Sequence, residues 1–159
     1  MLPERASTAE VDLARPSDEG SAALEFILVG LVLLVPIVYL VVALGSIQGQ
    51  ALGVETGARQ IARTIADAPD LVTADARAAR VRDAIVAEYG LDPDTVAVDI
   101  ACTGDNAACP EPGAMLTVTV TASVALPLVP AILGLDQLAR VPVEAASVQK
   151  VSRFWGTEP

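Results

Sequence analysis

The sequence predicts an α+β protein. A long N-terminal transmembrane helix with an amphipathic extension precedes a small domain, in which one or two helices pack on an antiparallel sheet of about three strands. Two observations predict this class. The run Phe26–Leu44 has no charged side chain, and as a helix rising about 1.5 Å per residue it would span roughly 28 Å, the thickness of the hydrocarbon core. From Thr95 onward, apolar and polar residues alternate as in β-strands.

A lone acidic residue marks the start of the apolar run. Glu25 directly precedes Phe26, behind four small or apolar residues and Gly20. A carboxylate that is buried in an apolar environment without a partner costs several kcal/mol. We therefore expect Glu25 to have a cationic partner.

The segment Gly20–Leu44, which begins GSAALEF, resembles the type IV prepilins. In that family a prepilin peptidase on the cytoplasmic face cuts after the last glycine of the leader, and the fifth residue of the mature chain is Glu followed by Phe. The resemblance implies cleavage between Gly20 and Ser21, with Glu25 and Phe26 as the subunit-pairing residues. The amine freed on Ser21 of one subunit would then neutralise Glu25 of the next.

Two other interpretations of the N-terminal segment stay open. An uncleaved single-pass anchor would keep residues 1–20 and hold Glu25 at the membrane interface, where a carboxylate costs little; the chain would then carry a binding or sensory domain. A secretory signal cut after Ala43 or Gly45 would need a basic start and a shorter apolar core than this segment has.

The charge distribution excludes one class of partner and leaves orientation nearly undetermined. The net charge is −10, which argues against nucleic acid, because that partner requires a basic surface. The polar segment 1–20 is expected to be a disordered leader, although it is acidic where prepilin leaders are usually basic. Arg5 and Arg15 before the span are balanced by Arg59 and Arg63 after it, so the cytoplasmic N-terminus rests on the prepilin resemblance.

The stem that follows the span, residues 46–68, is predicted to continue as an amphipathic helix. One face carries apolar residues at heptad-like spacing: Ile47, Ala51, Val54, Ala58, Ile61 and Ile65. A second ridge carries a glycine at every fourth position: Gly45, Gly49, Gly53 and Gly57. These glycines would let another helix approach closely, or would make the stem pliable, since each costs about 1 kcal/mol against Ala in a helix.

Ala68-Pro69-Asp70 is expected to end the stem, and Thr73 to cap a second helix that runs to Tyr89. The inner face of this helix would carry Ala74, Ala78, Val81 and Ile85, and the outer face Arg77, Arg80 and Asp83. Gly90 can supply the C-terminal cap, with Leu91 folding back. The arginines are interpreted as a solvated face.

Two strands are predicted from the alternation. The first has Val96, Val98 and Ile100 on one face. The second has a longer apolar face opposite a Thr/Ser face, and the apolar residues are Leu116, Val118, Val120, Ala122 and Val124.

The two cysteines, Cys102 and Cys109, flank the turn-rich sequence between these strands. They are too few for a zinc site in a chain without histidine. A disulfide in an oxidising compartment is favoured over two unpaired thiols, which would place the domain in the cytoplasm. Asp92, Asp94 and Asp105 match no calcium-loop spacing and are interpreted as solvated turn residues.

The segment Leu126–Leu138 is apolar and broken by Pro127 and Pro130. It is too short to span a membrane and too rich in proline for a strand, so we expect it to wrap the core or to present an apolar contact surface. Residues 141–152 are predicted to form the last strand. Phe154 and Trp155 then either close the core or meet a partner subunit.

Taken together, the order of segments resembles the TadE-like minor pilins of tight-adherence pilus systems. The predicted division is a leader (1–20), a transmembrane helix (21–45), a stem (46–68) and an extracytoplasmic domain (69–159). The resemblance implies a structural subunit whose partners are a prepilin peptidase, other pilins and membrane lipid. Because there is no histidine and no phosphate-binding loop, we expect neither catalysis nor a cofactor.

Overall fold

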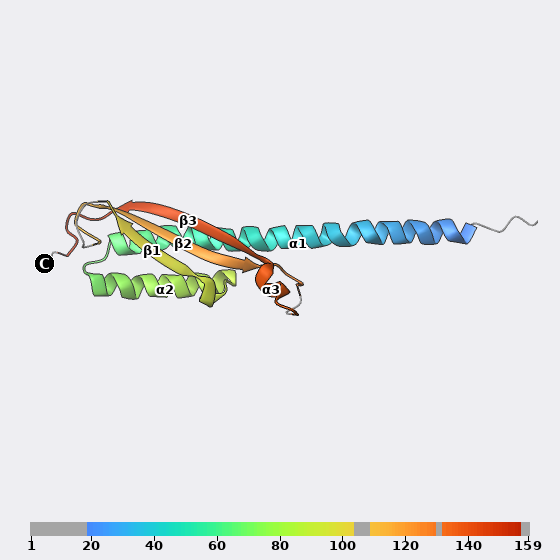
Figure 1. The fold of residues 1–159 in the computed structure, drawn as a ribbon. Coiled ribbons are helices and arrows are strands. Elements are labelled where there is room, and N and C mark those ends of the chain that lie inside the picture. The colour runs from blue at the N-terminus through green and yellow to red at the C-terminus, as the bar shows by residue number, and fades with distance from the viewer. Residues whose placement is uncertain (1–18, 104–108, 130–131, 157–159) are drawn as a thin grey trace, which may run out of the picture. The chain divides into compact units, whose positions relative to one another are not determined.

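The computed structural model describes residues 19–103, 109–129 and 132–156. The chain divides into two compact units, Met1–Tyr39 and Leu40–Pro159. The predicted α+β class is confirmed, because a long apolar N-terminal helix is followed by further helices and a three-stranded antiparallel sheet (Figure 1). In chain order the elements are α1 (Glu19–Ala66), α2 (Leu71–Tyr89), the 3-10 helix η1 (Pro93–Thr95), β1 (Ala97–Cys102), β2 (Met115–Ala125), α3 (Leu135–Leu138) and β3 (Arg140–Lys150).

Helix α1 continues past Pro36 and ends where the sequence predicts. Its last turn tightens, with the amide of Ala68 bonded to the carbonyl of Ile65 at 3.2 Å. Pro69 then stops the helix, because proline lacks the amide hydrogen that another turn would need. In the first compact unit, α1 is the only element among the described residues.

In the second unit, the part of α1 from Leu40 onward supplies one wall of the core. The predicted seam is confirmed at Val54, Ala58, Ile61 and Ile65, whose side chains are almost completely buried, while Ile47 and Ala51 are half-buried. The seam belongs to the same apolar cluster as the inner face of β2. The stem therefore packs on the chain's own sheet, within the same compact unit as the rest of the domain.

Helix α2 begins at Leu71, and its N-cap is Asp70. The prediction of Thr73 as the cap was therefore wrong. An Asp70 carboxylate oxygen accepts the Thr73 amide at 2.7 Å, and the other accepts the Thr73 hydroxyl at 2.8 Å, which satisfies a free amide of the first turn. These bonds hold the pKa of Asp70 below its ordinary value of 3.8, and the bond from the Thr73 amide has the largest effect.

The rest of α2 follows the predicted pattern. Ala74 and Ile85 are buried, and Ala78 and Val81 pack partly against the core, whereas the arginines of this helix are exposed. Gly90 ends the helix with φ 63°, a left-handed conformation that glycine adopts without a Cβ clash. The amide of Leu91 then bonds to the Val86 carbonyl at 3.1 Å.

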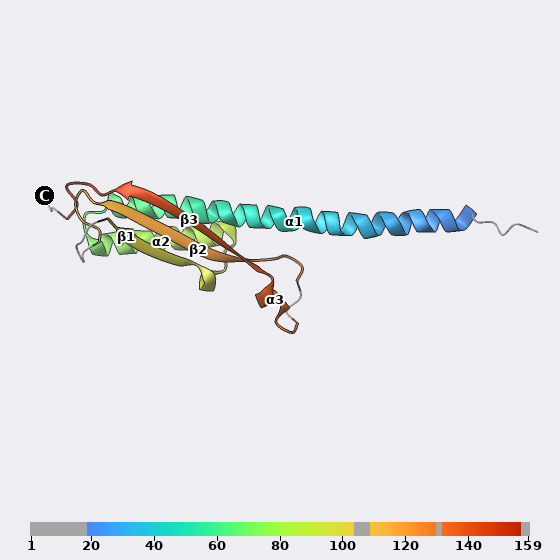
Figure 2. The same cartoon turned by 45° about the horizontal axis from the view of Figure 1, so that its top comes forward.

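The sheet is a meander with strand order β1-β2-β3 and both pairs antiparallel (Figure 2). In the centre, β2 pairs through Val120 with Val98 on one side and with Ala145 on the other. Its predicted inner face is confirmed, because Leu116, Val118, Val120, Ala122 and Val124 are all buried. Both helices supply residues to the core on this face.

The edge strand β1 is less buried than its alternation suggests. Val98 packs partly against the core, but Ile100 is 39% exposed. Ile100 borders an open groove that is also lined by Ile61, Ala78 and Ala79. Asp75 and Arg82 of α2 also line this groove.

The C-terminal Trp155 closes the far end of the core. Its indole Nε1 donates to the carbonyl of Ile65 at 3.2 Å, and its ring packs against the apolar cluster. Phe154 is 81% exposed. One of the two aromatic residues thus follows the expected role of closing the core.

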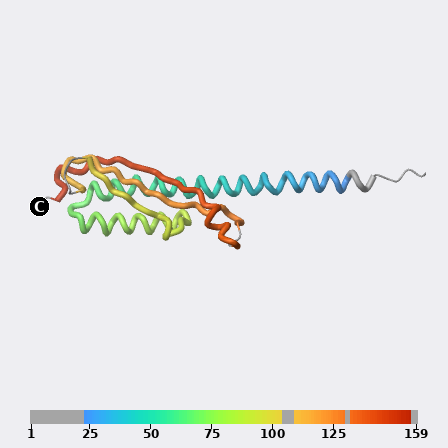
Figure 3. Tube along the Cα trace, viewed as in Figure 1, coloured from blue at the N-terminus to red at the C-terminus, as the bar shows by residue number. Residues whose placement is uncertain are grey.

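Two glycines of the ridge lie where α2 runs alongside α1 (Figure 3). A Cβ added at Gly53 would lie 2.5 Å from Cγ of Tyr89, and one added at Gly57 would lie 3.0 Å from Cδ1 of Ile85. At Gly45 and Gly49 an added Cβ would meet nothing within 4 Å. The ridge therefore admits a second helix at Gly53 and Gly57, and that helix comes from the same chain.

This difference along the ridge gives a matched pair of substitutions. Gly53→Ala should destabilise the fold by about 1–3 kcal/mol, because the new methyl group overlaps Tyr89 near its backbone. Gly49→Ala should instead stabilise it by up to about 1 kcal/mol, because it only removes the helix penalty of glycine. Thermal unfolding of the full chain in detergent, followed by circular dichroism, measures both. Two shifts of the same sign would contradict this packing.

Candidate functional site

Glu25 is the only charged residue between Gly20 and Val54. It lies near the start of α1 and is exposed. Within the described ranges it forms no hydrogen bond or ion pair with another residue of the chain. Within the described residues, this carboxylate therefore has no partner.

The residues that follow Glu25 form an apolar helical surface. The most apolar window of 18 residues in α1 has a mean hydropathy of 3.1, and only 6% of it is buried. Among the described residues, one helix near the N-terminus is long and apolar enough to cross a membrane. Its most apolar window is not covered by the protein as a core helix would be. Its exposed surface is compatible with single-pass anchoring.

The predicted processing site lies at the beginning of this helix. Gly20 and Ser21 lie within the first turn of α1, while residues 1–18 of the expected leader lie outside the described part. Ser21 and Glu25 are four residues apart, which is about 6 Å along the axis and nearly the same helix face. Position 21 therefore lies about one helical turn before Glu25.

The two cysteines form a disulfide, as predicted. The Sγ atoms of Cys102 and Cys109 are 2.07 Å apart, and their Cα atoms are 5.6 Å apart. The bridge ties the end of β1 to the segment that leads into β2. It lies in the second unit.

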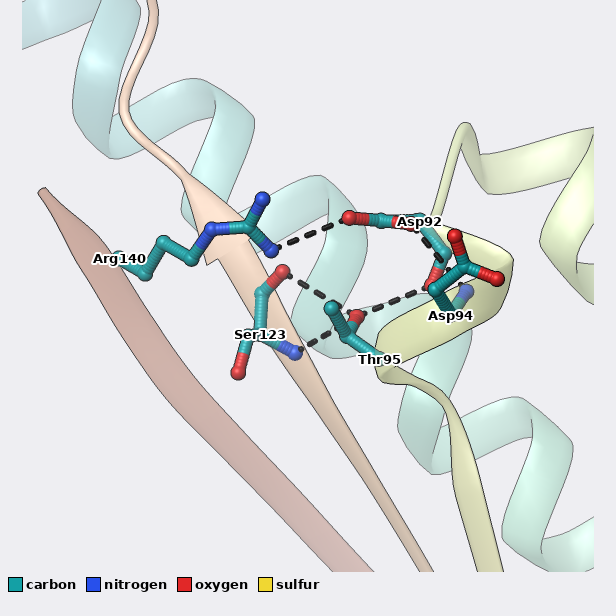
Figure 4. A network of polar contacts seen from close by, with 5 residues as sticks. All are labelled: Asp92, Asp94, Thr95, Ser123 and Arg140. Atoms are coloured by element: carbon teal, nitrogen blue, oxygen red, sulfur yellow. Dashed lines mark hydrogen bonds and ion pairs between the residues drawn. The ribbon is translucent and has the colours of Figure 1, made fainter. Parts of the chain in front are cut away.

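A polar network joins η1 to β2 and β3 (Figure 4). The Arg140 guanidinium lies 3.1 Å from the Asp92 carboxylate, and the Thr95 hydroxyl donates to the Asp92 carbonyl at 2.9 Å. The same hydroxyl accepts the amide of Ser123 at 3.2 Å. Asp92 also accepts the amide of Asp94 at 3.2 Å. The network holds the end of β2 and the start of β3 against η1.

The contacts of this network are structural. It pairs one carboxylate with one guanidinium and satisfies backbone groups, so no side chain is held as a base beside a nucleophile. Asp92 and Asp94, two of the aspartates weighed against a calcium site, serve here as turn and cap residues. Asp105 lies outside the described residues. In the described part, no group of three acidic or sulfur side chains is placed to hold a metal.

A groove of about 630 Å³ runs between α1 and β3. It is open to solvent and holds two carboxylates, Glu55 and Glu144. Glu55 pairs with Arg59 one helical turn away. Ala51 of α1 and Ala145 and Ala146 of β3 also line it.

The structure does not bring the candidate site residues together in one place. Gly20, Ser21, Glu25 and Phe26 belong to the first unit, whereas the disulfide and the four ridge glycines belong to the second. The sequence did not reveal the Asp92–Arg140 pair, which joins residues 48 positions apart.

No family model, curated protein or solved structure shows significant similarity to this chain.

The disulfide gives a measurable contribution to stability. Replacing Cys102 and Cys109 together by Ala should lower the free energy of unfolding by about 2.5 kcal/mol, because the loop they close is short and the unfolded chain regains its freedom. The midpoint of chemical unfolding in detergent measures the loss. A reducing agent should lower the midpoint of the wild-type chain and leave that of the double variant unchanged. Equal sensitivity of the two proteins would contradict a structural bridge.

Proposed function

We propose that the chain is a structural minor pilin, or pseudopilin, that is used to assemble an adhesion pilus of the tight-adherence type. A prepilin peptidase would remove residues 1–20, and the apolar part of α1 would join a bundle of pilin helices. The domain built on the sheet would remain outside the membrane. The protein would act by assembly and not by catalysis.

One observation carries the proposal: an uncharged, exposed helix with a single acid at its start. Glu25 stands at the fifth position after Gly20, and large apolar side chains such as Phe26 (80% exposed) surround the helix behind it. An apolar surface of this kind is stable in lipid or against other helices of the same kind. The requirement for a cation near Glu25 supports a second subunit as its neighbour.

The disulfide supports the proposed orientation. Structural disulfides form outside the cytoplasm in most organisms, so the bond between Cys102 and Cys109 is favoured if the second unit lies on the extracytoplasmic side. The N-terminus would then lie in the cytoplasm, where a prepilin peptidase acts. The partners in this proposal are that peptidase, other pilins and membrane lipid.

Substitution of Glu25 tests the proposal. Glu25→Ala should leave membrane insertion intact, because it removes the one charge from the span, but it should abolish incorporation with partner pilins. Immunoblots of membrane and sheared-pilus fractions, from cells that express the partner pilins, separate these two effects.

Glu55→Ala is the matched control. Glu55 is an acidic residue of the same helix whose exposed pair with Arg59 contributes little to stability, about 1 kcal/mol at most. This variant should assemble like the wild type. Normal piliation by the Glu25 variant would remove the proposed role of the carboxylate.

A further inference from the structure

An exposed apolar patch lies between β2 and β3. We call it the loop patch, and its members are Leu128, Ile132, Leu133, Leu135 and Leu138. Leu133 is 97% exposed, and Leu128 and Leu138 are each 82% exposed. Together these side chains place a large apolar surface at one end of the domain, which is costly in water.

The backbone holds two of these leucines in an unusual conformation. Leu128 has φ 64° and Leu133 has φ 56°, in the left-handed region where a side chain costs about 1–2 kcal/mol. Glycine or asparagine would fit both positions better. Both leucines thus combine a strained backbone with a large exposed apolar side chain.

The register of β3 along α1 fixes the height of the loop patch. The amide of Ser152 bonds to the carbonyl of Ala66 at 3.3 Å, and Ala145 lines the same groove as Ala51. These two anchors are about 23 Å apart along the strand and about 22 Å apart along the helix. Equal lengths of β3 and α1 therefore separate the two anchors, so a position on β3 can be converted into a level along α1.

Extending this register places the loop patch at the apolar end of the second unit. From Ala145 back to Arg140 is about 17 Å of strand, which equals about 11 residues of helix. Arg140 therefore lies at the level of about Leu40. Ala43 is already buried, at 6% exposed, so the domain covers α1 to this height. Figure 2 shows α3 at the end of the sheet opposite the turn from α1 to α2.

This level lies within the apolar run Phe26–Leu44. If α1 crosses a membrane, the loop patch reaches the lipid surface at the point where α1 leaves it. The start of the loop is held there by the bond from the Leu126 amide to the Ala139 carbonyl at 3.0 Å. The pair of Arg140 with Asp92 holds the adjoining start of β3.

We propose that the loop patch inserts into the outer surface of the lipid bilayer and forms a second membrane contact beside α1. This inference rests on the proposed membrane span of α1. The contact is apolar, because the patch has no basic residue and Arg140 is already paired. Asp136 of α3 limits the depth to the boundary between headgroups and acyl chains, about 5–10 Å.

Lipid-quenching of site-specific probes tests the insertion. The full chain is placed in phosphatidylcholine vesicles with an environment-sensitive fluorophore on Leu133→Cys, and the quencher is carried on the lipid acyl chains. Val72→Cys is the matched control, because Val72 is also apolar and 79% exposed but lies at the start of α2, beyond the opposite end of the core. Val35→Cys, within the uncharged run, reports the span itself.

We expect strong quenching at Val35 and at least about twofold more quenching at Leu133 than at Val72. Salt should not change the result, because no charge pair is involved. Quenching at Val35 with none at Leu133 would overturn the inference and leave the span intact. No quenching at Val35 would overturn the span as well.

A protein partner on the loop patch gives a different result. The Leu133 probe would then be shielded from a quencher in water and yet unaffected by the lipid quencher, which would overturn the lipid contact.

A double variant distinguishes loss of the lipid contact from loss of folding. Leu128→Asn with Leu133→Asn should unfold at an equal or higher temperature, since the strain is relieved, while a probe on Leu138→Cys loses its lipid quenching. Unchanged quenching in that variant would count against the two leucines as the inserting groups.

Discussion

The charge of Glu25 at the edge of an uncharged helix is the constraint on which the rest of the structure depends. The exposed side chains that follow it cannot remain in water, and an unpaired carboxylate cannot be taken far into lipid. No described residue of the chain supplies a cation for it. In the assembly proposed above, a neighbouring subunit with a free amine would both cover the helix and neutralise the acid.

The same helix then changes its role along its length. Up to Leu44 its side chains are mostly exposed and apolar, whereas from Val54 onward one face is buried against the sheet. The small residues Gly53 and Gly57 let α2 approach this second part closely. The domain is thus built directly on α1, and the register of β3 sets the height of the loop patch along that helix. A membrane contact by the patch would restrict how the domain can tilt.

Local patterns in the sequence predicted much of this fold. The alternation around Val118 gave the central strand, and the spacing of Val54, Ala58 and Ile61 gave the buried face of α1, because burial on one face imposes these periods. The start of α2 was misplaced by three residues, because Leu71 and Val72 are exposed in its first turn and resemble core residues. Features that join distant residues were not predictable. The Asp92–Arg140 pair depends on the tertiary fold, and the left-handed backbone at Leu133 has no signal in a leucine.

The mass of the mature protein tests the central claim most directly. The chain is purified from membranes of cells that contain the proposed prepilin peptidase, and the N-terminal residue is identified by mass spectrometry. The account predicts that the mature chain begins at Ser21, with or without a methyl group on its amine. A mature chain that still carries residues 1–20 would leave Glu25 without the proposed partner and would contradict the assembly of this protein as a pilin.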